Sequence, residues 1–340
     1  MLNNNVKKNV LINFAMLAVL ILLSLSLNIN SVLSMFSFLV IIPMVLLALG
    51  ANIVFSISSF VLVTALTFII YGGEFTALNS LTYLLPALLT GLIINNEEFR
   101  DKYGRKFKIK LKTDKELVNF ASIKVFLFSI VLFILGLIAY YLIMKFLYKI
   151  DFVKEFSKFT KAIITQYKSV LKPGEFEKLQ KAGFFDIFED TSSLVMIMAF
   201  LKAMISAIIS YFICIPLYKK AYNNKIVYIT FDNIILPGRP VIVLFISIIV
   251  LFLLGQSYPE LGMNSVINNY ILVMNILFFI EGLSLITFVV KSWKSIKNRI
   301  NWLLIVFLII FMGILPGISI LGMLDNVINF RKKWYSEIGS

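Results

Sequence analysis

Long runs of apolar residues, each about the length of a membrane-spanning helix, alternate along the chain with short polar links. A helix needs about 20 mostly apolar residues to cross the roughly 30 Å hydrocarbon core of a bilayer. The runs therefore predict an all-α, polytopic transmembrane bundle with eight or nine spans. The candidate spans are residues 9–27, 31–49, 52–71, 76–95, 119–147, 193–218, 240–256, 266–290 and 302–324.

The composition favours a membrane protein over a soluble one. The 340 residues are 60% hydrophobic and 15% charged, whereas soluble domains are about half apolar and about a quarter charged. No stretch is long and polar enough for a separate soluble domain, so residues 1–340 are predicted to form a single integral membrane domain. Residues 10–27 follow Lys7 and Lys8 as a signal peptide would. No small-residue cleavage site follows them, so we expect them to remain as the first span.

Basic links between the spans predict a cytoplasmic N-terminus. Loop 96–118 follows the first four spans (9–95) and carries eight basic against five acidic residues, and loops 219–239 and 291–301 are also basic. The span 119–147 then places residues 148–192 outside. These loops carry most of the net charge of +14, and cytoplasmic lysines and arginines also meet anionic lipid headgroups. Nucleic acid is not a predicted partner, since no soluble basic module is present.

The last apolar run allows two topologies. A ninth complete span would leave the basic residues Arg331, Lys332 and Lys333 outside. Pro316-Gly317 interrupts the run, and proline kinks a helix. Either residues 302–315 enter the membrane and residues 317–329 return as a re-entrant segment, or one kinked helix crosses it. The C-terminal spans as a group cover residues 193–329.

Residues 148–192 predict an amphipathic extracellular segment. Aromatic and aliphatic residues recur there at steps of three and four, with lysines mostly between them, which is typical of an amphipathic helix. The sequence Lys172-Pro173-Gly174 ends that helix, and a second, short helix is expected at about 175–182. The segment either lies on the outer leaflet or caps a cavity.

Glu281, within the apolar run 270–290, is the leading candidate for a functional side chain. A carboxylate at this depth is costly in lipid, so it usually faces the interior of a bundle. It is a structural partner of another buried polar group, a ligand-binding or transport group, or an unpaired protonated acid. Lys202 is the expected partner in the first case, although its long side chain could instead reach the headgroups.

Asn268 and Asn275 are further candidates for an intramembrane polar site. They are seven residues apart and therefore lie on one face of a helix. Such residues either form a polar stripe toward a solute or join neighbouring helices through amide hydrogen bonds.

Several motifs of enzymes are missing from the sequence. It has no phosphate-binding GxxxxGK[ST] loop, no HExxH, no paired CxxC and no GxSxG nucleophile elbow. It has no histidine, and Cys214 is its single cysteine. Histidine is the usual acid–base group near neutral pH. We therefore predict a protein that is not an enzyme, with no catalytic, cofactor-binding or metal-binding residues.

Short motifs in the C-terminal half resemble the YybS-like family of multipass bacterial membrane proteins. The matching stretches are Leu236-Pro237-Gly238-Arg239-Pro240, Asn268-Asn269-Tyr270-Ile271-Leu272, Glu281-Gly282-Leu283-Ser284 and Leu321-Gly322-Met323-Leu324-Asp325, followed by Phe330-Arg331-Lys332. The resemblance extends over nearly the whole chain. It implies a multipass protein of the bacterial plasma membrane.

The N-terminal spans show a more distant similarity to the S components of energy-coupling-factor transporters. Pro43 and Gly50 precede a long apolar span, and Pro86 and Gly91 follow it. The similarity implies a module that binds a small solute in the lipid bilayer and is energised by separate transporter subunits. The alternative is a structural or regulatory envelope protein that recruits partners through its basic cytoplasmic loops.

Overall fold

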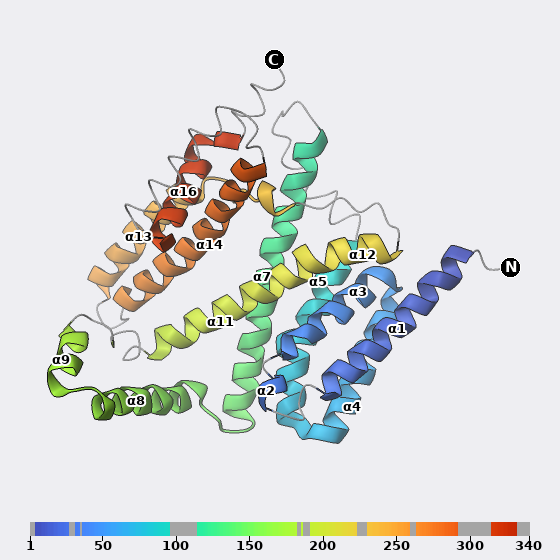
Figure 1. Ribbon diagram of the computed structural model, residues 1–340, viewed down its shortest axis with the longest axis horizontal. Helices are drawn as coiled ribbons and strands as arrows, with labels where there is room; N and C mark the ends of the chain where they lie inside the picture. The colour runs from blue at the N-terminus through green and yellow to red at the C-terminus, as the bar shows by residue number, and fades with distance from the viewer. Residues whose placement is uncertain are drawn as a thin grey trace, which may run out of the picture. The chain divides into compact units, whose positions relative to one another are not determined.

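The structure is a computed structural model that describes residues 4–26, 31–34, 36–95, 114–181, 185, 191–222, 230–258, 263–291 and 314–331. All regular elements in these ranges are helices, which confirms the predicted all-α class. The chain divides into two compact units, unit 1 (Met1–Tyr103 and Val125–Ile226) and unit 2 (Gly104–Lys124 and Val227–Ser340). Both units are drawn in Figure 1. The single membrane domain expected from the sequence stays a prediction.

Unit 1 contains most of the helices (Figure 1), and α7 belongs to it from Val125 onward. Its elements are α1 (Asn4–Ser26), α2 (Ser31–Ser34), the 3-10 turn η1 (Ser37–Val40), α3 (Ile41–Gly50), α4 (Ile53–Asn79), the π-helical turn η2 (Ser80–Leu84), α5 (Leu85–Asn95), α7 (Asp114–Phe146), α8 (Phe152–Val170), α9 (Pro173–Lys181), α11 (Thr191–Ile208), the π-helical turn η3 (Ile209–Ile213) and α12 (Cys214–Tyr222).

Six helical stretches among the described residues are long and apolar enough to cross a membrane. They are Lys8–Ser26, Ile53–Asn95, Val125–Phe146, Ser193–Tyr222, Pro240–Ser257 and Val266–Lys291. Two shorter apolar helices are Ser37–Gly50 and Pro316–Ile328. Several helices crossing a bilayer make this a multipass membrane protein. The count of eight or nine spans and the cytoplasmic N-terminus stay predictions.

The stretch Ile53–Asn95 folds back on itself. Gly72 has φ 78° and ψ −177°, a conformation that breaks the helix and that residues with a Cβ rarely adopt. The hydroxyls of Thr64 and Ser80 lie 3.1 Å apart, although 16 residues of straight helix would separate them by about 24 Å. The chain therefore turns at Gly72, between the predicted spans 52–71 and 76–95, and joins two antiparallel helical arms.

The predicted span 31–49 is divided into shorter pieces. Within α3, every residue from Pro43 to Leu49 is buried, and the helix packs against α1, α5 and α12. The chain turns directly after it, because the Asn52 side chain accepts a hydrogen bond from the Phe55 amide (2.7 Å) and so caps the start of α4. The short helix α3 thus forms the centre of unit 1.

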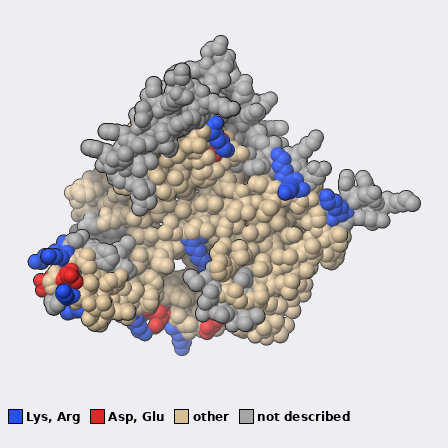
Figure 2. Space-filling model, viewed as in Figure 1, with Lys and Arg blue, Asp and Glu red and all other residues tan. Residues whose placement is uncertain are grey.

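The amphipathic segment forms the two helices that the sequence predicts. Asp151 caps α8, since its Oδ1 accepts hydrogen bonds from the amides of Val153 (3.1 Å) and Lys154 (3.3 Å). Pro173 then begins α9, consistent with proline at the first position of a helix. Charged side chains on the visible face gather mainly over these helices (Figure 2). Their extracellular side stays a prediction, and most of the basic loop 96–118 lies outside the described residues.

Unit 2 contains the start of α7 (up to Lys124), the 3-10 turn η4 (Phe231–Asn233), α13 (Pro240–Ser257), α14 (Met263–Lys291) and α16 (Ile314–Ile328). Helices α14 and α16 lie side by side (Figure 1) and form the main contact of the unit. A Cβ added at Gly282 would overlap the Ile318 carbonyl, and one at Gly322 would overlap the Phe278 carbonyl. The two glycines therefore allow the helices to approach closely. Residues 301–313 lie outside the described residues, so both topologies of the last apolar run stay predictions.

Candidate functional site

Glu281 lies in α14 with none of its surface exposed. Its Oε1 accepts a hydrogen bond of 3.4 Å from the Asn326 side chain in α16. Asp325 lies in the last turn of the same helix and Arg331 follows its end, and both are also buried. We call Glu281, Ser284, Asp325, Asn326 and Arg331 the ionic cluster. All five belong to unit 2.

Arg331 is the centre of the ionic cluster. Its Nε lies 2.9 Å from Asp325 Oδ2, an ion pair whose N–H is not aligned as a hydrogen bond. Its Nη1 donates to the Asp232 carbonyl (2.8 Å) and to Ser284 Oγ (2.9 Å), and its Nη2 donates to the Glu281 carbonyl (3.3 Å). A buried guanidinium is tolerated only with such partners.

The end of α16 brings Arg331 back toward α14. Asn329 has φ 54°, the left-handed conformation that commonly ends a helix. Its amide donates to the Asp325 carbonyl (2.7 Å). The chain therefore turns within a few residues, and the guanidinium at residue 331 returns to the carboxylate at residue 325.

The ionic cluster also holds the segment that precedes α13. Ser284 Oγ accepts from the Ile234 amide (3.1 Å) and donates to the Ile234 carbonyl (3.2 Å). Asn326 donates to the Leu236 carbonyl (3.1 Å). Backbone groups of an irregular segment need partners when they are buried, and the cluster supplies them.

An ion pair between Asp232 and Lys291 lies at the edge of the same segment, with 2.5 Å between Oδ1 and Nζ. Burial by itself raises the pKa of Asp232. Hydrogen bonds from Lys291 and Thr230, together with the positive charge of Lys291, outweigh that effect, so the pKa lies below its usual value. The Lys291 side chain is 59% exposed, so this pair is a surface feature beside the buried cluster.

Lys202 lies in α11 of unit 1 and has neighbours of a different kind. Its Nζ lies 3.5 Å from Thr82 Oγ1, longer than an ordinary hydrogen bond, and 4.4 Å from the centre of the Tyr83 ring. That ring distance is typical of a cation–π contact. No acidic side chain in the described part of the chain lies within 4.0 Å of this ammonium. We call Lys202, Thr82 and Tyr83 the Lys202 site.

The π-helical turn η2 supplies both neighbours of Lys202. Thr82 Oγ1 donates to the Leu78 carbonyl (2.7 Å), so its single proton is already used. A π-helical turn is rare and occurs frequently at functional sites, because it rotates the side chains that follow relative to an α-helix.

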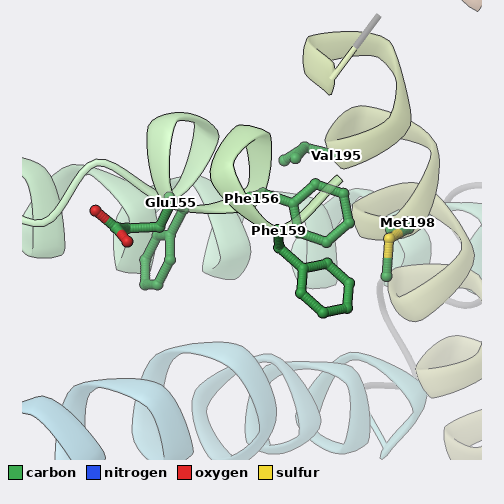
Figure 3. Close-up of a pocket in the computed structure, with 6 residues that line it drawn as sticks. Glu155, Phe156, Phe159, Val195 and Met198 are labelled. Atoms are coloured by element: carbon green, nitrogen blue, oxygen red, sulfur yellow. The ribbon is translucent and has the colours of Figure 1, made fainter. Parts of the chain in front are cut away.

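An apolar groove of about 380 Å³ lies between α8 and α11. Figure 3 shows its walls, which are Phe152, Glu155, Phe156 and Phe159 from α8 and Val195 and Met198 from α11. Val195, Met198 and Lys202 are spaced by three and four residues, so they share one face of α11. Phe152 also contacts Tyr140, with ring centres 5.4 Å apart. The groove and the Lys202 site are therefore neighbours along one helix.

The structure distributes the four predicted site residues among different surroundings. Glu281 has Asn326 and Arg331 as partners, and Lys202 has Thr82 and Tyr83. Asn268 is exposed, while Asn275 is partly buried and offers its backbone carbonyl to Ser319 Oγ (3.1 Å). No described hydrogen bond joins either asparagine to Glu281.

Asp325 and Arg331 are the residues that sequence reasoning did not select. The sequence placed both within one family-like motif, and Arg331 was counted only among basic tail residues. Their spacing of six residues across the end of a helix was the sequence feature that could have indicated the pair. This spacing is informative only if the chain turns at Asn329.

Comparisons with known proteins yield one family. The family model described as "Predicted membrane protein (DUF2232)" matches residues 15–326. No curated protein and no solved structure matches the chain. The family match supports a membrane protein. It carries neither the YybS-like name nor the relationship to S components, which stay predictions.

Proposed function

The chain belongs to the DUF2232 family of predicted membrane proteins, and we propose that its function is to bind a small solute in unit 1 without chemical conversion. In this proposal the protein is a module of the bacterial plasma membrane, and separate transporter subunits energise any movement of the solute. The binding residues are those of the Lys202 site, and unit 2 has a structural role.

The observation that carries this proposal is the set of neighbours around the Lys202 ammonium. It lies within an apolar helix and has a hydroxyl and an aromatic ring as its described neighbours. A charge removed from water without an opposite charge is costly, and such groups inside a membrane protein usually mark a substrate or ion site. A solute that supplies the missing partner would relieve that cost.

Glu281 is assigned to structure rather than to binding. The sequence favoured it as the solute-binding residue, but its described contacts are with α16 and with Arg331. A carboxyl group with no exposed surface is reached by a solute only after the helices separate. The ionic cluster therefore acts in this proposal to hold α14, α16 and the segment before α13 together.

Affinity purification of the tagged protein from its own host in mild detergent tests the proposal. Mass spectrometry would identify both the proteins and the small molecules that are retained. We expect the wild-type protein to retain a small solute and Lys202→Met to lose it. Lys161→Met, which replaces an exposed lysine of α8, is the control and should retain the solute.

Two other results would change the conclusion. Co-purified transporter subunits together with the solute would extend the function to transport. Retained partner proteins without any solute, under conditions that keep known transporters intact, would contradict solute binding. That outcome would support the alternative of an envelope protein that recruits partners.

A further inference from the structure

We propose that the solute is a small organic acid with an apolar body, whose acid group binds Lys202 and whose body occupies the groove between α8 and α11. This inference rests on the proposed function and adds the chemical class of the solute. It combines the donors at the Lys202 site with the shape and lining of the neighbouring groove.

The polar end of the site offers hydrogen-bond donors and positive charge. A lysine ammonium has three N–H donors, and the long contact of 3.5 Å with Thr82 Oγ1 occupies at most one of them. The Thr82 proton points to the Leu78 carbonyl and cannot serve a ligand. Two N–H donors with a full positive charge are a match for a carboxylate or a phosphate, because charge-assisted hydrogen bonds are the stronger kind.

The other end of the site is apolar. Phe156, Phe159 and Met198 present rings and a thioether to the groove (Figure 3). Glu155 is the acidic residue at its edge, and Lys158 neutralises it across 2.7 Å. An apolar body therefore fits this surface, and the local charge does not repel an acid.

The two ends are close enough for one ligand to reach both. Met198 and Lys202 are one helical turn apart, a rise of about 6 Å along α11. The contact between Phe152 and Tyr140 continues the aromatic wall from α8 to α7.

The size of the groove favours a small free acid over a lipid. Its volume of about 380 Å³ lies at the lower end of the range of about 300–1,000 Å³ for small-molecule sites. A small molecule fills a groove of this volume. The occupant is therefore a single small molecule with one acid group at the end of a short apolar body.

The test uses the full chain in nanodiscs of zwitterionic phosphatidylcholine, with 4-phenylbutyrate as the probe. Affinity is measured by calorimetric titration, and 4-phenylbutanol and 4-phenylbutylamine are the uncharged and cationic controls. We expect binding of the acid alone, affinity retained in Lys202→Arg, and a loss of at least about tenfold in Lys202→Met. Phe159→Ser removes an exposed wall of the groove and should also weaken binding, whereas Lys161→Met should not.

A second measurement keeps the test independent of folding. The wild-type protein is labelled with an amine-reactive reagent, with and without 4-phenylbutyrate, and the labelled lysines are quantified by mass spectrometry. Protection of Lys202 but not of Lys161 would support the inference. Equal binding of the alcohol, or labelling of Lys202 that the acid leaves unchanged, would overturn it.

The same design separates the inference from the function on which it rests. A retained solute that is neutral or cationic would overturn the acid class and leave solute binding intact. If no solute is retained and no probe binds, the proposed function fails as well. If anionic phosphatidylglycerol in the nanodisc displaces 4-phenylbutyrate from wild type, the site belongs to a lipid headgroup, and the free acid is the wrong occupant.

Discussion

Arg331 in unit 2 and Lys202 in unit 1 are both cations among apolar helices, but their neighbours differ. The Arg331 guanidinium has a carboxylate, two backbone carbonyls and a hydroxyl around it. The Lys202 ammonium has one distant hydroxyl and a ring. The first cation has its counter-ion within the protein, whereas the second lacks an anion among its described neighbours.

This difference separates a structural charge from a binding charge. A buried charge whose partners all belong to the protein contributes to fold specificity. Removing one of those partners strongly destabilises the fold. A charge that lacks a partner and is partly exposed is instead able to gain one from a ligand. The two sites therefore respond differently to substitution, and the following changes test that contrast.

Replacing Arg331 with methionine should have the largest effect. It leaves Asp325 buried without its counter-ion, for which we expect a loss of about 3–5 kcal/mol in the free energy of unfolding. Reversible unfolding in mixed micelles measures the loss. The double variant Arg331→Met, Asp325→Asn should recover part of the stability. A loss below about 1 kcal/mol would show that the ionic cluster is not a structural unit.

Replacing Gly322 with alanine should have the next largest effect. The added Cβ would overlap the Phe278 carbonyl, and forcing such a shift between packed helices costs about 1–3 kcal/mol. Gly174→Ala is the matched control, because no atom lies within 4 Å of a Cβ added there. The same unfolding assay applies. Equal stability of the two variants would contradict the close contact of α14 with α16.

The helices could be predicted from the sequence because lipid leaves the backbone few alternatives. The apolar run 266–290 corresponds to the candidate span Val266–Lys291, since a backbone in hydrocarbon must satisfy its own hydrogen bonds. The reversal at Gly72 and the start of α9 at Pro173 followed from residues with special backbone freedom or restriction.

The surroundings of the two charges could not be predicted in the same way. Lys202 was the expected partner of Glu281 if that carboxylate has a structural role. The described partners depend instead on a left-handed turn at Asn329 and on a π-helical turn around Thr82 and Tyr83. Both are local departures from α-helical geometry, and the hydrophobic periodicity of the sequence does not indicate them.

Replacing Glu281 with glutamine tests the assignment of roles at a smaller scale. The amide oxygen can still accept the hydrogen bond from Asn326, so stability should change by about 1 kcal/mol or less. Binding of 4-phenylbutyrate should stay unchanged, while Lys202→Met loses it. If Glu281→Gln abolishes binding in a protein that unfolds at the wild-type midpoint, the binding role belongs to Glu281.

The pair of Asp232 and Lys291 should give the smallest effect, one that depends on pH. The folded-state pKa of Asp232 lies below its ordinary value of 3.8. The pair therefore stabilises the fold above about pH 4 and loses this contribution as the pH falls through the folded-state pKa. Lys291 is 59% exposed, so the contribution at neutral pH is about 0.2–1 kcal/mol and decreases with salt.

Comparing wild type with Asp232→Asn at pH 7 and at pH 3 isolates this contribution from other titrations. The difference in free energy of unfolding between the two proteins should be larger at pH 7 than at pH 3, and salt should reduce it at pH 7. Arg331 donates its hydrogen bond to the backbone carbonyl of residue 232 and not to its carboxylate, so the ionic cluster should stay intact in the variant. A difference that is the same at both pH values would show that the side chain acts through packing rather than through charge.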